Sequence, residues 1–201
     1  MQPIAISLLT ICGIEELTLH GTRGVTHVLS ILDPEQPDPE AFQNFGAHHR
    51  TLLRFHDEIE PRSGVVLPAR EHVEEIIAFG RSLADTARQD REGHLLVHCH
   101  AGISRSTAAM ATLLAQVYPD RDEASIFARL LAMRPKAWPN SRMIGYADEM
   151  LGRDGRMLHA LGRLYARQLV TFPNTARFMQ ENARAREVAM ASEPALEAAE
   201  A

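Results

Sequence analysis

The sequence predicts an α/β fold, in which a central and mostly parallel sheet is flanked by helices and followed by a helical C-terminal half. Between residues 4 and 117, short apolar runs rich in β-branched side chains alternate with longer segments of helical pattern. This alternation is typical of parallel strands joined by crossover helices. After residue 117 the pattern is helical only, with proline or glycine between the segments.

Four apolar runs are expected to form the strands. The clearest, at residues 25–32, is rich in β-branched side chains and stops at Asp33-Pro34, as expected of a central strand. Three prolines between residues 33 and 39 indicate an exposed connection, because proline neither donates to a strand ladder nor continues a helix. The other three runs lie at residues 4–10, 51–55 and 95–97, and a short helix or turn is expected at 13–19.

The first long helix is expected to begin near Pro68, a residue that is favoured at the first helical position. Its non-polar positions fall on one face over about five turns; they are Val73, Ile76, Ile77, Phe79, Gly80 and Leu83. The polar segment at 86–93 should end this helix. Further helices are expected at residues 104–117, at 120–133 and 140–152, and at 156–169.

Capping residues mark two of these later helices. Asp120 with Glu123 three positions on has the pattern of a capping box for the helix that runs to Met133, which Pro135 then ends. Asn140 is a candidate N-cap for the next helix, which Gly152 closes. Trp138, the only tryptophan, is expected to pack at the edge of this helical half.

Length and composition indicate one globular domain. The chain has 201 residues, of which 45% are hydrophobic and 23% charged, and the apolar period fades near residue 170. We therefore expect a domain at 1–169 and a C-terminal extension at 170–201 that is frayed or disordered.

Charge and cysteine content restrict the setting of the protein. The formal net charge of -5 argues against nucleic-acid binding. No segment approaches the roughly 20 apolar residues of a membrane span. Cys12 and Cys99 are the only cysteines, too few for a disulfide framework, so a cytoplasmic location is expected.

Residues 98–106, between an expected strand and an expected helix, read His-Cys-His-Ala-Gly-Ile-Ser-Arg-Ser. A tight turn that opens a helix leaves several N–H groups unpaired at the positive end of the helix dipole, where an anion binds. Gly102 permits backbone angles that a side chain would forbid. The same field favours the thiolate of Cys99, and Arg105 can hold two phosphoryl oxygens through its planar guanidinium.

This His-Cys-x5-Arg-Ser segment resembles the signature of the protein-tyrosine and dual-specificity phosphatase superfamily. The resemblance extends over roughly residues 4–151, since the strand at 24–31, an aspartate loop, a helix, a strand and the signature follow in the family's order. The Ala-Gly-Ile-Ser-Arg-Ser run is similar to that of compact bacterial tyrosine phosphatases. It implies a phosphatase-like fold and a cysteine-dependent protein-tyrosine phosphatase that needs no cofactor and no metal ion.

The resemblance also implies a role for each residue of the segment. Cys99 attacks phosphorus to form a thiophosphoryl-cysteine intermediate, and Ser106 stabilises the departing thiolate. Arg105 holds the equatorial oxygens together with backbone amides. The amides belong to the substrate-binding residues His100, Ala101, Gly102, Ile103, Ser104 and Arg105.

The family's general acid is an aspartate on a loop upstream of the signature, and Asp57 is the candidate here. It follows an expected strand and precedes a segment whose proline and glycine suit a movable flap. It lies further upstream of Cys99 than is usual in the family, which extra polar residues before Gly93 explain. Glu58 and Glu60 remain rivals, with Asp33 as a more distant one.

Other interpretations remain open. An inactive relative that still binds phosphoproteins, a phosphatase for a small phosphomonoester, and a rhodanese-type sulfurtransferase all use a related loop. His94, His98 and His100 with Cys99 suggest zinc, although neighbouring residues of a strand point to opposite faces. The loop contains no lysine, which favours a phosphoprotein or small phosphomonoester over a phosphoinositide. The oligomeric state is left open.

Overall fold

The computed structural model describes residues 6–86 and 93–192. Its centre is a four-stranded sheet in the order β1-β4-β2-β3, and every neighbouring pair is parallel. The strands are β1 (Ile6–Cys12), β2 (His27–Leu32), β3 (His49–Arg54) and β4 (Gly93–His98). The α/β fold predicted from the sequence is confirmed.

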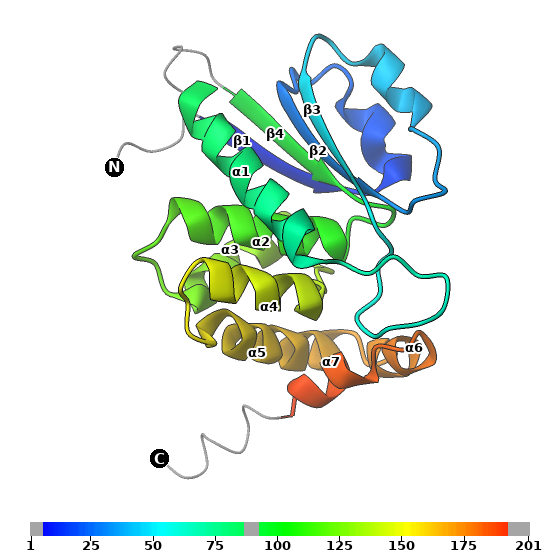
Figure 1. Cartoon of the computed structure of the whole chain (residues 1–201), viewed down its shortest axis with the longest axis vertical. Helices are drawn as coiled ribbons and strands as arrows, with labels where there is room; N and C mark the ends of the chain where they lie inside the picture. Colours follow the sequence, from blue (N-terminus) through cyan, green and yellow to red (C-terminus); the bar gives the residue numbers. More distant parts are fainter. Residues whose placement is uncertain (1–5, 87–92, 193–201) are drawn as a thin grey trace.

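The first five α-helices follow the order that the sequence predicts, and two further helices come after them. The α-helices are α1 (Arg70–Thr86), α2 (Arg105–Val117), α3 (Glu123–Met133), α4 (Ser141–Met150), α5 (Arg156–Thr171), α6 (Thr175–Glu181) and α7 (Ala185–Met190). Two 3-10 helices, η1 (Ile14–His20) and η2 (Glu40–Asn44), lie in the N-terminal half. Figure 1 shows the sheet at one end of the molecule and the helical half at the other.

Both faces of the sheet are covered, which explains why β2 and β4 are apolar or buried at every position. Alternate side chains of the strands, such as Leu29 and Val97, join the large core that the α-helices complete. The intervening ones, such as Val28 and Leu96, join a smaller core under η1 and η2. Because the strands are all parallel, their carboxyl ends meet at one edge of the sheet, where parallel sheets commonly bind ligands.

The loops after three strands carry the residues that the sequence singles out. Asp33 follows β2, the loop of residues 55–69 with Asp57 follows β3, and Cys99 follows β4. We call residues 99–105 the cysteine loop and residues 55–69 the β3–α1 loop. In Figure 1 the β3–α1 loop reaches down to α6 and α7, so the C-terminal helices lie next to the candidate site.

Some expectations from the sequence differ from the structure. The N-cap of α3 is Asp122, whose side chain accepts from the amide of Ser125, and not Asp120. The expected fraying from residue 170 does not describe the chain up to 192, where α6 and α7 form and bury Met179 and Glu187. The division at 169/170 stays a prediction, and residues 193–201 and the polar segment 87–92 lie outside the described residues.

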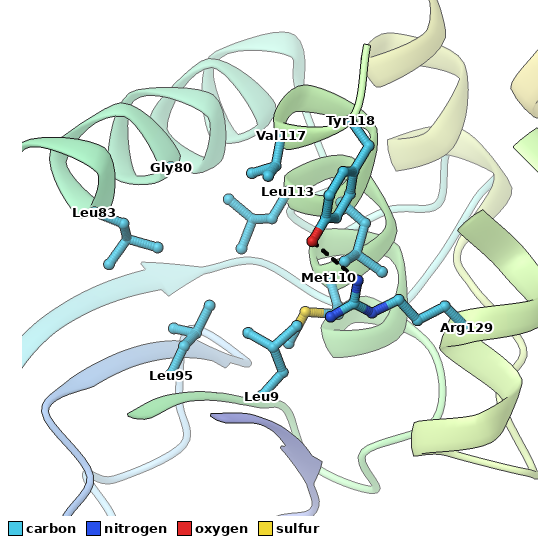
Figure 2. A pocket seen from close by; sticks show the side chains of 10 residues that line it. Leu9, Gly80, Leu83, Leu95, Met110, Leu113, Val117, Tyr118 and Arg129 are labelled. Carbon is cyan, nitrogen blue, oxygen red and sulfur yellow. Dashed lines mark hydrogen bonds between the residues drawn. The ribbon is translucent and has the colours of Figure 1, made fainter. Parts of the chain in front are cut away.

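An apolar cavity of about 50 Å³ lies between the sheet and helices α1 and α2. Figure 2 shows Leu9 and Leu95 from the strands facing Leu113 from α2, with the hydrogen bond between Arg129 and Tyr118 at one side. Its lining includes none of the predicted site residues. Within 6–86 and 93–192, no helix combines the length and apolar character needed to cross a bilayer.

Candidate active site

The backbone of the cysteine loop turns its carbonyl groups outward. Four consecutive carbonyls accept hydrogen bonds from outside the loop: His100 from the amide of Ile14 (2.9 Å), Ala101 and Gly102 from Nη2 and Nε of Arg134 (3.0 Å each), and Ile103 from the amide of Trp138 (2.8 Å). A trans peptide points its N–H opposite to its C=O. The amides of residues 101–104 therefore face the inner side of the loop, at the start of α2, and favour an anion there.

Gly102 is required at the centre of this loop for two reasons. Its φ of +69° lies in the left-handed region, and a Cβ would come within 2.4 Å of the carbonyl carbon of Cys12. Both the backbone angle and the close approach of β1 thus exclude a side chain. The expectation that glycine permits a forbidden conformation here is confirmed.

Gly102→Ala is expected to lower the free energy of unfolding by about 3 kcal/mol or more, because left-handed strain and overpacking each cost about 1–3 kcal/mol. Gly24→Ala is the matched control: Gly24 has a φ of +65° but nothing within 4 Å of its added Cβ. Urea unfolding of both variants measures the difference. Equal losses would show that the contact with Cys12 has no energetic weight.

Cys99 and Ser106 lie together at the base of the loop. The Sγ of Cys99 is 3.1 Å from the Oγ of Ser106, and the two residues are 2% and 0% exposed. Ser106 can therefore donate a hydrogen bond to a thiolate at Cys99. Burial chiefly, with Glu16 nearby, raises the pKa of the other cysteine, Cys12, to about 12.

Arg105 extends from the first turn of α2 and is 2% exposed. Its Nη1 donates to Oδ1 of Asp33 at 2.6 Å and to the carbonyl of Phe55. Its Nε is buried and has no partner among the described residues. A buried donor without a partner is costly, so Nε is a candidate donor to a bound anion.

Asp57 contacts the cysteine loop directly. Its Oδ1 accepts from Oγ of Ser104 at 2.7 Å and from Nδ2 of Asn140 at 3.0 Å, and its Oδ2 lies 3.3 Å from Nη1 of Arg184. Burial alone would raise the pKa of Asp57, but Arg184, Arg105 and the two hydrogen bonds outweigh it and hold the pKa below its usual range. The ionised carboxylate thus adds stability above its unfolded pKa, which is lost as the pH falls through the folded value.

The three rivals of Asp57 have other partners. Glu58 pairs with Arg62 on the same loop, and Glu60 lies 3.7 Å from Arg186 on α7. Asp33 pairs with Arg105 itself. Of the four carboxylates, Asp57 is the one that accepts a hydrogen bond from the hydroxyl of a cysteine-loop residue, which favours it over the others as the acid of the site.

Comparison with known proteins gives a result at the level of structure. No family model matches the chain, and no curated protein matches it either. A human tyrosine phosphatase-like serine/threonine/tyrosine-interacting protein matches with a TM-score of 0.54 and 18% identity, over 75% of this chain and 95% of that one. Human DUSP28 matches with a TM-score of 0.53 and 18% identity, over 76% and 99%. The chain has the dual-specificity phosphatase fold.

A third solved structure with the dual-specificity phosphatase fold agrees. PTPMT1 in complex with PI(5)P matches with a TM-score of 0.51 and 13% identity, over 73% of this chain and 91% of that one. At these identities the likeness establishes the fold alone. About a quarter of the chain lies outside each of the three matches.

The histidines near the cysteine loop of this phosphatase fold do not converge on one point. His94 bonds Thr10 (2.8 Å) and the carbonyl of Arg23 (3.1 Å), whereas Nε2 of His98 lies 2.7 Å from Oγ of Ser30. Burial chiefly, with Arg50 nearby, lowers the pKa of His98 to about 4, so its ring is neutral. His100 is exposed. In the described part of the chain, no three His, Cys, Asp or Glu side chains gather in a way that could hold a metal ion.

Four residues that shape the site in this phosphatase fold were not assigned to it from the sequence. Arg134 holds two carbonyls of the cysteine loop and pairs with Glu16 at 2.9 Å. Asn140 is the expected cap of α4 and also donates to Asp57. Arg184 and Glu187 come from the C-terminal helices. The Asn140 cap pattern was visible in the sequence, but nothing local marked the other three.

Proposed function

We propose that this protein is a cysteine-dependent phosphomonoester hydrolase whose substrates are phosphotyrosine proteins. The observation that supports it best is the cysteine loop, whose carbonyls bond outward so that its amides face inward at the start of α2, next in the chain to the buried thiol of Cys99 and the buried guanidinium of Arg105. Such an arrangement offers both a nucleophile and fixed positive charge where a phosphoryl group develops charge. The carboxyl group of Asp57 lies beside the loop through its hydrogen bond with Ser104.

The proposed reaction has two displacements. The Cys99 thiolate attacks phosphorus, an S–P bond forms, the P–O bond to the leaving group breaks, and Asp57 gives its proton to the leaving oxygen. Water then attacks phosphorus, Asp57 takes a proton from that water, and the S–P bond breaks to release inorganic phosphate. Ser106 stabilises the thiolate each time it is present, through the 3.1 Å contact. The loop amides and Arg105 hold the phosphoryl oxygens throughout.

The position of the thiol favours an aryl phosphate. Cys99 and Arg105 are each 2% exposed, while His100 and Ala101 beside them are exposed at the rim. A phosphoryl group must therefore pass the rim before it reaches sulfur. The ring of phosphotyrosine carries its phosphate further from the peptide backbone than the short side chain of phosphoserine does, and so reaches a recessed nucleophile more readily.

A second candidate function is a phosphoprotein-binding module without turnover. The ion pair between Asp57 and Arg184 favours it, because an ionised Asp57 has no proton to donate. One structural neighbour carries the name of a tyrosine phosphatase-like interacting protein. This candidate predicts binding of a phosphotyrosine peptide without release of phosphate, whereas the first predicts release.

The test measures phosphate release from p-nitrophenyl phosphate, phenyl phosphate and matched phosphotyrosine and phosphoserine peptides. We expect turnover of the first three, inhibition by vanadate and no effect of EDTA. Binding of the phosphotyrosine peptide without any turnover would select the second candidate. Turnover of small phosphomonoesters alone would select a small-molecule phosphatase.

Asp57→Asn is expected to slow phenyl phosphate about 10²-fold or more and p-nitrophenyl phosphate less than about 10-fold, because a poor leaving group depends more on the acid. Since the pKa of Asp57 is lowered, wild-type kcat/KM for phenyl phosphate should rise as the pH falls toward that value. Glu58→Gln and Glu60→Gln are the matched controls. A leaving-group effect in either control, with none in Asp57→Asn, would move the acid to that residue.

A further inference from the structure

The C-terminal helices place two charged side chains in the interior, beside the β3–α1 loop. Arg184 lies between α6 and α7 and is 6% exposed, and Glu187 on α7 is 0% exposed. The two are joined by Nε to Oε2 at 2.7 Å and Nη2 to Oε1 at 2.9 Å. Buried charges persist only when they are paired and hydrogen-bonded, so the further partners of this pair indicate what it does.

Arg184 contacts two parts of the candidate active site at once. Its Nη1 donates to Oγ of Ser104 in the cysteine loop at 2.9 Å and lies 3.3 Å from Oδ2 of Asp57. Ser104 in turn donates to Oδ1 of Asp57 at 2.7 Å. The three side chains close a ring that fixes the carboxyl group of Asp57 against the cysteine loop.

Glu187 holds the guanidinium of Arg184 in this position. Its Oε2 accepts from Nε1 of Trp138 at 2.7 Å, and its Oε1 accepts from the amide of Ser141 at 2.8 Å. Trp138 is stacked on Tyr165 of α5, with ring centroids 4.2 Å apart, and its own amide bonds the carbonyl of Ile103. Both oxygens of Glu187 are thus engaged, and Arg184 has one well-defined orientation.

We infer that Arg184 is a positioning residue of the active site, fixed by Glu187, and that the α6–α7 segment therefore belongs to the catalytic unit. The inference rests on the proposed function, since it concerns the acid of that reaction. Arg184 lies beyond the domain at 1–169 that the sequence predicts. Arg184 orients Asp57 through the ion pair and the shared contact with Ser104, and touches neither the nucleophile nor the leaving group.

The charges around Asp57 show what Arg184 does to proton transfer. Arg184 from the α6–α7 junction and Arg105 from α2 face it with positive charge, and Tyr165 on α5 and Glu187 on α7 lie behind Arg184. Burial raises the pKa of Tyr165 well above its usual value, so it is neutral. Arg184 is the largest influence opposing burial. Removing its charge should raise the pKa of Asp57 and extend general-acid catalysis to higher pH.

The experiment compares Arg184→Met and Arg184→Gln, which remove the charge, with Arg184→Lys, which keeps it. In the neutral variants we expect the high-pH limb of kcat/KM for phenyl phosphate to move up by about one pH unit, the lower end of the usual effect of a nearby opposite charge. Arg184→Lys should move it by less than half as much. Arg186→Met, a change at an exposed position on α7 two residues away, should leave it in place.

A purely structural role would lower stability and the amount of active enzyme but leave the limb where it is, and that result would overturn the inference. Titration of the Asp57 carboxyl carbon by NMR in the same proteins does not require turnover. It therefore separates failure of this inference from failure of the proposed function. If neither neutral variant folds, the wild-type titration decides, because an Asp57 pKa at or above the usual aspartate value would contradict the role of Arg184.

Discussion

Cys99→Ser is expected to reduce hydrolysis of p-nitrophenyl phosphate by about three orders of magnitude or more, the scale on which loss of a covalent nucleophile acts. The proposed reaction needs an anionic sulfur at Cys99, whereas a serine hydroxyl at the same position remains protonated because its intrinsic acidity is far lower. The hydroxyl of Ser106, 3.1 Å away, would then face a second hydroxyl. Initial rates across pH 5–8 give the measurement.

Two comparisons make this result specific. Vanadate or inorganic phosphate should still bind Cys99→Ser, since the inward amides and the guanidinium of Arg105 are unchanged, and isothermal titration calorimetry measures that binding. Cys12→Ser is the matched control, because Cys12 is also buried and lies at the end of the neighbouring strand. Retained turnover in Cys99→Ser, or an equal loss in Cys12→Ser, would exclude Cys99 as the nucleophile.

The parts of the fold that the sequence predicted correctly are those governed by local chemistry. The end of β4, a glycine with positive φ and the first turn of α2 follow one another within a dozen residues around the cysteine loop. Each of these features has a recognisable sequence pattern. The same holds for the strand at 27–32 and for the Asn140 cap. The N-cap of α3 was predicted wrongly at Asp120, because Asp122 lies two residues further on and only the backbone geometry shows which of the two caps the helix.

The contacts that the sequence did not reveal join distant parts of the chain. Arg134 meets Glu16, and Arg184 meets Asp57, across more than a hundred residues in each case. The sequence after residue 170 predicted fraying because α6 and α7 are short and rich in alanine and charged residues. Their stability comes from what they bury, including Met179 and the Arg184–Glu187 pair. The sequence pattern does not predict such a buried ion pair, since arginine and glutamate on a helix usually indicate an exposed face.

The long interval between Asp57 and Cys99 also has a structural account. The β3–α1 loop and α1, which ends at Thr86, fill most of it, and Asp57 still returns to the cysteine loop through Ser104. Sequence distance therefore says little about the distance between these side chains. The shared edge of parallel strands brings them together, because β3 and β4 both end there.

Arg105→Lys is expected to lower kcat/KM for p-nitrophenyl phosphate by about 10²- to 10³-fold, the loss typical of removing one donor that stabilises transition-state charge. Lysine keeps the positive charge but has a single nitrogen, whereas Arg105 uses Nη1 for Asp33 and the carbonyl of Phe55 and keeps Nε free of any partner in the described residues. A single ammonium group cannot contact Asp33 after β2, Phe55 after β3 and the phosphoryl group at the same time.

Arg54→Lys is the matched control, because Arg54 also lies at this edge and donates to the carbonyls of residues 33, 34 and 36 and to the carboxylate of Asp38, none of which belongs to the cysteine loop. It should keep its activity within a few-fold. If Arg105→Lys kept as much activity as Arg54→Lys, positive charge alone would suffice for catalysis, and the planar shape of the guanidinium would not matter. A large loss confined to Arg105→Lys, with vanadate binding weakened in parallel, would show that the loop recognises a phosphoryl group by shape as well as by charge.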